Sequence, residues 1–173
     1  MSNKSERYLT KSRMKLGLEC PKKLYYYEDY KSQDSDNEFL EILAEGGYQV
    51  GELAKYYYKF HYPDYHYVDI ISLDYEESIK ATNDALKHEN VVIAEPAITF
   101  DNFFIRVDVL VKKGNMIQLV EVKAKSCTSD DENDFLSFKK SGVSIKSNWR
   151  PYLADVAFQT YVTSQAFPDW LIT

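Results

Sequence analysis

The sequence predicts an α/β protein in which an antiparallel three-stranded meander, part of a mixed sheet, is flanked by helices. Three segments rich in Val, Ile and Phe follow one another over residues 91–125 and are separated by the turn pairs Asp101-Asn102 and Gly114-Asn115. Amphipathic helical patterns precede and follow this block. The 173 residues are 45% hydrophobic and 28% charged, which suits one domain with its own core, covering residues 1–173.

The first 37 residues are expected to form an N-terminal helical segment (1–37) in front of a core (38–173). Residues 9–30 predict two short helices broken at Cys20-Pro21, because proline is favoured in the first turn of a helix and Cys20 would then lie near its N-cap. The polar residues 31–37 predict a loop.

The core is expected to begin with a helix over residues 38–58, where apolar side chains recur at helical spacing. A Tyr-rich stretch, Tyr62 to Ile71, includes a short predicted strand. Asp74 and Glu77 have the spacing of a capping box, which predicts a second helix up to about Leu86.

After the meander, residues 126–149 are polar and include an acidic cluster, so they predict a loop excursion. A last helix is expected over residues 151–166. Its less polar stripe, and hence its predicted buried face, consists of Leu153, Val156, Ala157, Tyr161 and Ser164.

The second and third strands of the predicted meander contain the candidate functional residues. A two-residue turn at Gly114-Asn115 would set Asp108 opposite Glu121 and Arg106 opposite Lys123. Because side chains alternate along a strand, Asp108, Glu121 and Lys123 would share one face. The other face would be a core face, carrying valines at positions 107, 109, 111, 120 and 122.

Two carboxylates directly opposed on neighbouring strands repel one another. A divalent cation such as Mg²⁺ would remove the conflict, with the Val122 carbonyl as a further ligand and Lys123 near a phosphate. Alternatively, Arg106 and Lys123 neutralise the two acids without any metal. Spacing alone favours neither interpretation. Glu95, next to Pro96, is predicted to be a strand-end residue rather than a further carboxylate of the site.

Asp108 followed by Glu121-Val122-Lys123 resembles the D…(D/E)-x-K signature of the PD-(D/E)XK nuclease superfamily. The chain is most similar to RecB-type nuclease domains, including CRISPR adaptation nucleases, and to a bacterial family of uncharacterised RecB-like proteins. The resemblance spans nearly the whole chain in five ordered pieces: residues 9–25, residues 47–54, Arg106-Val107-Asp108, Glu121-Val122-Lys123 and residues 155–159.

The resemblance implies a restriction-endonuclease-like core of helix, antiparallel meander, helix and a further strand. It implies that Mg²⁺ or Mn²⁺ is held by Asp108, Glu121 and the Val122 carbonyl, and by Glu52 through water. It implies that Lys123 orients or deprotonates the attacking water and that Gln159 positions water or Lys123. RecB-type domains place a tyrosine four residues after this glutamine, where the present sequence has Thr163.

Cysteine content bears on a second cofactor. In CRISPR-type relatives a cysteine at the position of Cys20 joins three others in an iron–sulfur cluster, and a four-thiolate cluster needs four cysteines. This chain offers only Cys20 and Cys127, so no cluster is expected from it alone. Either the chain is the front part of a longer protein or the cluster is absent. A missing C-terminal domain or final strand would leave a sheet edge open to dimerisation.

Net charge bears on the partner. The charge of −6 and pI of about 5.1 argue against a protein that coats duplex DNA. The first 23 residues nevertheless form a basic strip, suited to guiding single strands or DNA ends together with nearby tyrosines. A solvated terminus would explain the same charges equally well. No apolar run predicts a membrane span or a signal peptide, so a cytoplasmic location is expected.

The leading prediction is therefore a metal-dependent deoxyribonuclease of DNA repair or defence. One alternative is a catalytically inactive nuclease-like module that binds nucleic acid or a partner. Another is an unrelated α/β domain whose acids only pair with Arg106 and Lys123.

Overall fold

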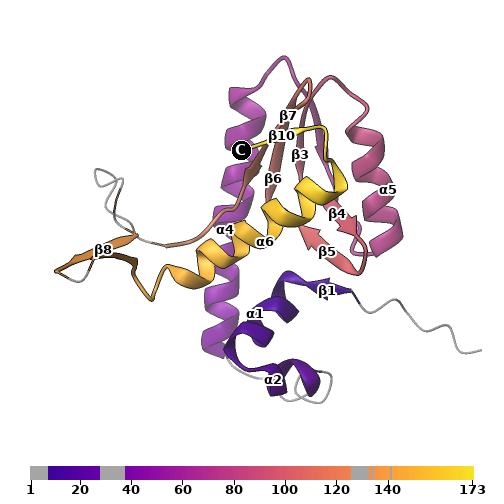
Figure 1. The fold of residues 1–173 in the computed structure, drawn as a ribbon. Helices are drawn as coiled ribbons and strands as arrows, with labels where there is room; N and C mark the ends of the chain where they lie inside the picture. Colours follow the sequence, from indigo (N-terminus) through magenta and orange to yellow (C-terminus); the bar gives the residue numbers. More distant parts are fainter. Residues whose placement is uncertain (1–7, 28–37, 126–132, 134, 141) are drawn as a thin grey trace, which may run out of the picture.

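The computed structural model describes residues 8–27, 38–125, 133, 135–140 and 142–173, with only the backbone for 38–45 (Figure 1). The N-terminal segment contains two short helices that meet at Cys20, as predicted. Cys20 ends the first helix and caps the second, which starts with proline. The elements of this segment are β1 (Leu9–Thr10), α1 (Lys11–Glu19) and α2 (Pro21–Tyr25).

The larger sheet has five strands in the order β10-β7-β6-β3-β2. Its centre, β3-β6-β7, is an antiparallel meander, while β2 runs parallel to β3 and β10 runs parallel to β7. The predicted meander and mixed sheet are thus confirmed. The five strands are β2 (His66–Asp69), β3 (Asn90–Ala94), β6 (Val109–Lys113), β7 (Met116–Val120) and β10 (Leu171–Ile172).

The β6–β7 hairpin has the predicted register. Lys113 pairs with Met116 and Val109 pairs with Val120 around the Gly114-Asn115 turn, in which Gly114 has a φ of 58°. The ladder ends at Val109, one residue short of Asp108. The two acids predicted to lie opposite one another, Asp108 and Glu121, are the next residues after the last ladder pair, Val109 and Val120, where the ladder stops.

The reason is a bend shared by two chain segments, at Glu95-Pro96 and at Val107-Asp108. The Glu95 N–H donates to the Asp108 carbonyl (3.0 Å), and the Val107 N–H donates to the Pro96 carbonyl (3.1 Å). Beyond the bend the chain continues in a second sheet, β1-β5-β4, with β4 at Ala97–Phe100 and β5 at Phe103–Arg106. Two predicted long strands are each divided between two sheets.

This bend also removes Arg106 from its predicted place opposite Lys123. Arg106 belongs to β5 and pairs with Ala97, and its guanidinium donates to the Ser72 carbonyl (2.6 Å). Val107 lies beyond the bend as well and packs in the core on the other side of the sheet from Val109.

Helices cover both faces of the five-stranded sheet (Figure 1). The long helix α4 (Glu38–His61) lies over Val92, Val109, Val111 and Val120, through Tyr58 and neighbouring tyrosines. The opposite face carries the larger core, which α5 (Tyr75–Ala85) and α6 (Arg150–Ala166) cover. That core contains the fully buried side chains Val91, Ile93, Leu110, Ile117 and Val162.

Two predictions about the C-terminal third need correction. Residues 126–149 are more than a loop, because they include a hairpin of β8 (Leu136–Lys139) and β9 (Gly142–Ile145). The edge of β7 is also not bare, because β10 pairs with it. Residues 31–37 and Cys127 lie outside the described residues. Within the described part of the chain, no helix is both long and apolar enough to cross a bilayer.

Helix α5 begins as its sequence predicts. The Asp74 side chain accepts the Glu77 N–H (2.9 Å). The reciprocal half of the capping box passes through Ser72, whose hydroxyl accepts the Asp74 N–H and donates to the Glu77 carboxylate. The helix is thereby fixed beside the bend.

Thr82 anchors α5 to the second sheet. Its fully buried hydroxyl donates to the Ser78 carbonyl and accepts the Ala97 N–H, each at 2.8 Å. Thr82→Val keeps the side-chain shape but leaves a buried N–H without its acceptor, so we expect a loss of about 1–3 kcal/mol in the free energy of unfolding. Urea denaturation checks this, with Thr82→Ser as the control that retains the hydroxyl. Equal stability of wild type and Thr82→Val would contradict it.

Candidate active site

Asp108 lies at the bend where the two sheets part. Its Oδ2 accepts the Val122 N–H at 2.5 Å, so the carboxylate reaches across to the segment that follows β7. Asp108 and Val122 also line a cavity of about 160 Å³ beneath α4. The side chain is thus held by the backbone of the Glu121-Val122-Lys123 motif.

Glu121 receives hydrogen bonds from three side chains. Its Oε1 accepts from Lys11 (2.9 Å) and from Lys123, and its Oε2 accepts from Lys11 (3.1 Å) and from the Gln159 amide (2.6 Å). The Glu121 side chain is only 7% exposed. Of the two cations predicted to neutralise the acids, Lys123 does pair with Glu121, while Arg106 is replaced by Lys11 from the N-terminal segment.

Helix α6 buries its polar face, which is the opposite of the predicted stripe. Asp155 and Gln159 are buried, whereas Val156 and Tyr161 are 43% and 49% exposed. Lys15 of α1 approaches Asp155 at 2.6 Å, one helical turn after Lys11 reaches Glu121. The stripe prediction failed because Asp155 and Gln159 on this face meet α1 and the site, while Val162 further along the same face packs in the apolar core.

Asp155 is a residue that the sequence interpretation did not single out as part of the site. The signal that could have found it is the matched spacing of Asp155 with Gln159 and of Lys11 with Lys15, each pair four residues apart and so on one helix face. The Oδ1 atom of Asp155 is buried without a hydrogen-bond partner among the described residues.

A second group of acids lies beneath α4. Glu52 and Glu95 line the same 160 Å³ cavity as Asp108, and Lys55 lies there too, 2.9 Å from the Glu52 carboxylate. Gly47 and Gly51 form part of the cavity wall on α4. Glu52 is therefore brought to Asp108 but is paired with Lys55, while Gln159 contacts Glu121 rather than Lys123.

Glu95 is more than the end of a strand. Its backbone has a φ of 56°, a conformation that costs energy for a residue with a side chain and that often marks functional sites. Burial raises the pKa of the Glu95 carboxyl, and the charge of Asp108 raises it further, against the lowering effect of Lys55. The sequence signal is the bend-forming Glu95-Pro96 pair within a β-rich run.

The surroundings of Asp108 and Glu121 shift the pKa values of the two carboxyl groups in opposite directions. Burial and the charge of Glu121 raise the pKa of Asp108, partly offset by Val122 N–H, Lys11 and Lys123. Burial alone would raise the pKa of Glu121 as well, but hydrogen bonds from Lys123, Gln159 and Lys11 hold it below its ordinary value. Lys123, in turn, has a raised pKa because Glu121 and Asp108 outweigh its burial.

The oxygen atoms at the site are of the kind that binds a hard divalent cation. Asp108 and Glu121 carry interacting negative charges, and Asp108 in particular is a carboxylate whose charged form lacks full compensation. Carboxylate and carbonyl oxygens, here with the Val122 carbonyl, are the ligands that Mg²⁺ and Mn²⁺ prefer. The described residues contain no cluster of three or more His, Cys, Asp or Glu side chains already arranged around one point.

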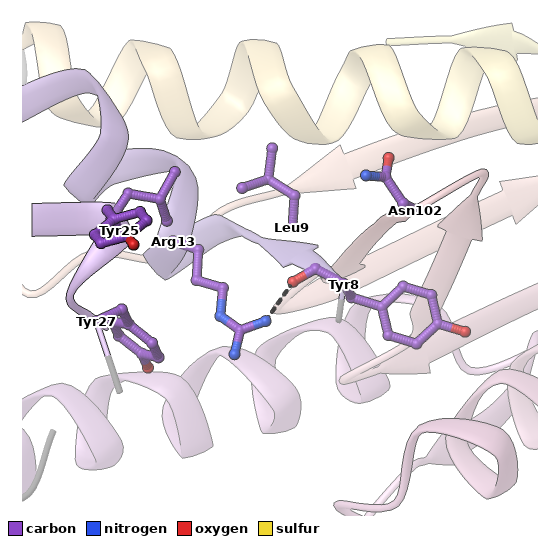
Figure 2. Close-up of a pocket in the computed structure, with 7 residues that line it drawn as sticks. Tyr8, Leu9, Arg13, Tyr25, Tyr27 and Asn102 are labelled. Atoms are coloured by element: carbon purple, nitrogen blue, oxygen red, sulfur yellow. Dashed lines mark hydrogen bonds between the residues drawn. The ribbon is translucent and has the colours of Figure 1, made fainter. Parts of the chain in front are cut away.

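A separate cavity of about 290 Å³ lies between the N-terminal segment and the β4–β5 turn (Figure 2). Arg13 lies in it between two tyrosines, with its guanidinium 5.1 Å from the Tyr27 ring centre and 2.8 Å from the Tyr8 carbonyl. The other lining residues are Leu9, Leu24, Tyr25 and Asn102. Such a combination of aromatic faces and a guanidinium suits a stacked planar group.

Glu95 yields a pH-dependent prediction. Because its pKa is raised in the folded state, the folded chain binds this proton more tightly than the unfolded chain, and stability falls as pH rises from the ordinary value of 4.5 through the raised pKa. In EDTA, we expect Glu95→Gln to be more stable than wild type at pH 7, by less than about 1 kcal/mol because the carboxyl is only partly buried. Urea denaturation at pH 4 and pH 7 measures this; a variant that is less stable at pH 7 would contradict it.

No family model matches the chain, and neither the curated proteins nor the solved structures contain a match.

Proposed function

We propose that the protein is a Mg²⁺- or Mn²⁺-dependent nuclease that hydrolyses DNA phosphodiester bonds, with a restriction-endonuclease-like core. The observation that carries the proposal is the convergence of Asp108, Glu121 and Lys123 at the open end of the β6–β7 hairpin, where Asp108 accepts the Val122 N–H and Lys123 donates to Glu121. The order of helix α4, meander, helix α6 and strand β10 agrees with that core.

The residues of the site would have different roles. Asp108, Glu121 and the Val122 carbonyl would hold the cation, and Glu52 would reach it through water. A bound cation would supply charge to activate a water and to neutralise the phosphorane-like transition state. Lys123, kept cationic by the neighbouring acids, would hold the attacking water and offset charge on the phosphate. Gln159 would orient Glu121, because its amide donates to Oε2.

Single-stranded DNA or DNA ends are the proposed substrate. The net charge of −6 disfavours broad contact with a duplex. The cavity containing Arg13, Tyr25 and Tyr27 offers a place where an unpaired base can stack, a contact worth about 1–3 kcal/mol per base.

The test is cleavage of labelled single- and double-stranded DNA in Mn²⁺ and in EDTA, with Asp108→Ala as the matched variant. The proposal predicts cleavage by the wild type in Mn²⁺ only, faster on single strands, and none by the variant. Metal-independent cleavage, or equal cleavage by wild type and variant, would contradict it.

One observation favours a second candidate, a nuclease-like module that binds nucleic acid without cutting it. A carboxylate has roughly four acceptor positions, and those of Glu121 are taken by Lys11, Lys123 and Gln159. A site satisfied in this way can be stable without metal. DNA binding that is independent of Mn²⁺, without cleavage, would favour this candidate.

A further inference from the structure

Lys11 lies at the centre of the site although it comes from the N-terminal segment. Thr10 caps helix α1, accepting the Arg13 N–H, and β1 pairs in parallel with β5 through Leu9 and Phe103. These contacts fix the first residue of α1 beside the hairpin. The Lys11 side chain is 23% exposed and the Glu121 side chain 7%, so the pair is largely shielded from water.

The contact made by Lys11 differs from those of the other two donors. Its ammonium bonds both Glu121 oxygens, at 2.9 and 3.1 Å, whereas Lys123 bonds only Oε1 and Gln159 only Oε2. Its charge also lowers the pKa of Asp108, so it acts on both acids of the hairpin. A single cationic group therefore spans Glu121 and compensates Asp108, which is the electrostatic task assigned above to a divalent cation.

Lys123 and Gln159 are less suited than Lys11 to withdraw from Glu121. Lys123 is also 3.2 Å from the Val122 carbonyl, so its contacts stay within its own segment. Gln159 is buried on α6 and carries no charge. Since the acceptor positions of Glu121 are all taken, binding of a cation there requires one donor to withdraw, and Lys11 is the donor whose withdrawal frees one acceptor position on each oxygen.

We propose that Lys11 is a phosphate-binding lysine of the active site, whose ammonium occupies Glu121 until a divalent cation displaces it and substrate DNA receives it. The proposal rests on the nuclease function argued above. In this exchange the Lys11 ammonium leaves Glu121 and meets a phosphate oxygen of the DNA. No covalent bond is made or broken.

Lys11→Met tests this, because methionine keeps most of the length of the side chain and removes its charge. The control is Lys113→Met, at the exposed far end of the same hairpin. In the absence of DNA, calorimetric titration with Mn²⁺ is expected to show about tenfold tighter binding by Lys11→Met, since competition for a charged hydrogen bond ends. Lys113→Met should match the wild type.

The second readout is the salt dependence of binding to a single-stranded oligonucleotide in Ca²⁺. Loss of one phosphate contact should lower the slope of log affinity against log salt concentration by about 0.7 in Lys11→Met. Lys11→Arg, which restores the charge, should recover the slope and shows that the fold is intact.

The outcomes separate the two claims. If the wild type binds Mn²⁺ and Lys11→Met binds it no more tightly, or keeps the full salt slope, the role of Lys11 is overturned and the nuclease function survives. If the wild type binds no Mn²⁺, the nuclease function and the displacement of Lys11 are overturned together. Tighter Mn²⁺ binding with a reduced slope supports the proposal.

Discussion

Asp108→Ala is expected to abolish metal-dependent cleavage, with a loss of about 10³-fold or more. Of the two acids at the hairpin, Asp108 is the one with the raised pKa, and its carboxylate is held in place by the Val122 N–H. Removing it withdraws a principal anchor of the cation, whose charge stabilisation is worth several kcal/mol.

The same variant should lose metal-dependent stabilisation. With Mn²⁺ at one hundred times its dissociation constant, the wild type should gain about 2.7 kcal/mol, which corresponds to a rise of roughly 5–10 °C in Tm. Asp108→Ala should show no rise with Mn²⁺. An unchanged Mn²⁺-dependent rise in Asp108→Ala would rule out the assigned role.

Lys123→Met is expected to reduce cleavage by about 10²–10³-fold while Mn²⁺ binding is retained. Lys123 bonds Glu121 and the Val122 carbonyl but contributes no oxygen that a cation could use, so its removal leaves the proposed ligands intact. What is lost is the positive charge at the phosphate and the attacking water, a contribution of the size expected for a preorganised electrostatic group.

Single-turnover cleavage together with calorimetry checks this prediction, and Lys125→Met is a suitable control. Lys125 lies two residues further along, with its ammonium about 5 Å from the Trp149 and Tyr152 rings rather than at Glu121. Normal turnover by Lys123→Met, or a loss equal to that of Lys125→Met, would remove Lys123 from the catalytic group.

Local signals predicted much of this fold. The Gly114-Asn115 turn determined the register of β6 and β7, and the Asp74 cap located the start of α5. These features depend on neighbours in the sequence, where turn chemistry and capping act directly. The same applies to the approach of Asp108 to the Glu121 segment, which follows from a two-residue turn.

The parts that could not be predicted depend on contacts between distant segments. Beyond the bend at Glu95-Pro96 and Val107-Asp108, β5 pairs with β1, and no residue near Phe103 indicates in the sequence that Leu9 is its partner. The buried face of α6 includes Asp155 and Gln159 beside the core residue Val162, because Lys15 and Glu121 from distant segments pair with the two polar side chains, so hydrophobic periodicity selected the wrong stripe. Lys11 was recognised only as part of a basic strip for the same reason.

The most direct test of a shared cation is a crystal structure obtained in Mn²⁺, with the ion located by its anomalous scattering. We expect one strong anomalous peak, coordinated by the Asp108 and Glu121 carboxylates and the Val122 carbonyl. The Lys11 ammonium should no longer bond Glu121. The opposite result would be a crystal grown in saturating Mn²⁺ in which no anomalous peak lies next to Asp108 and Lys11 still bonds both oxygens of Glu121.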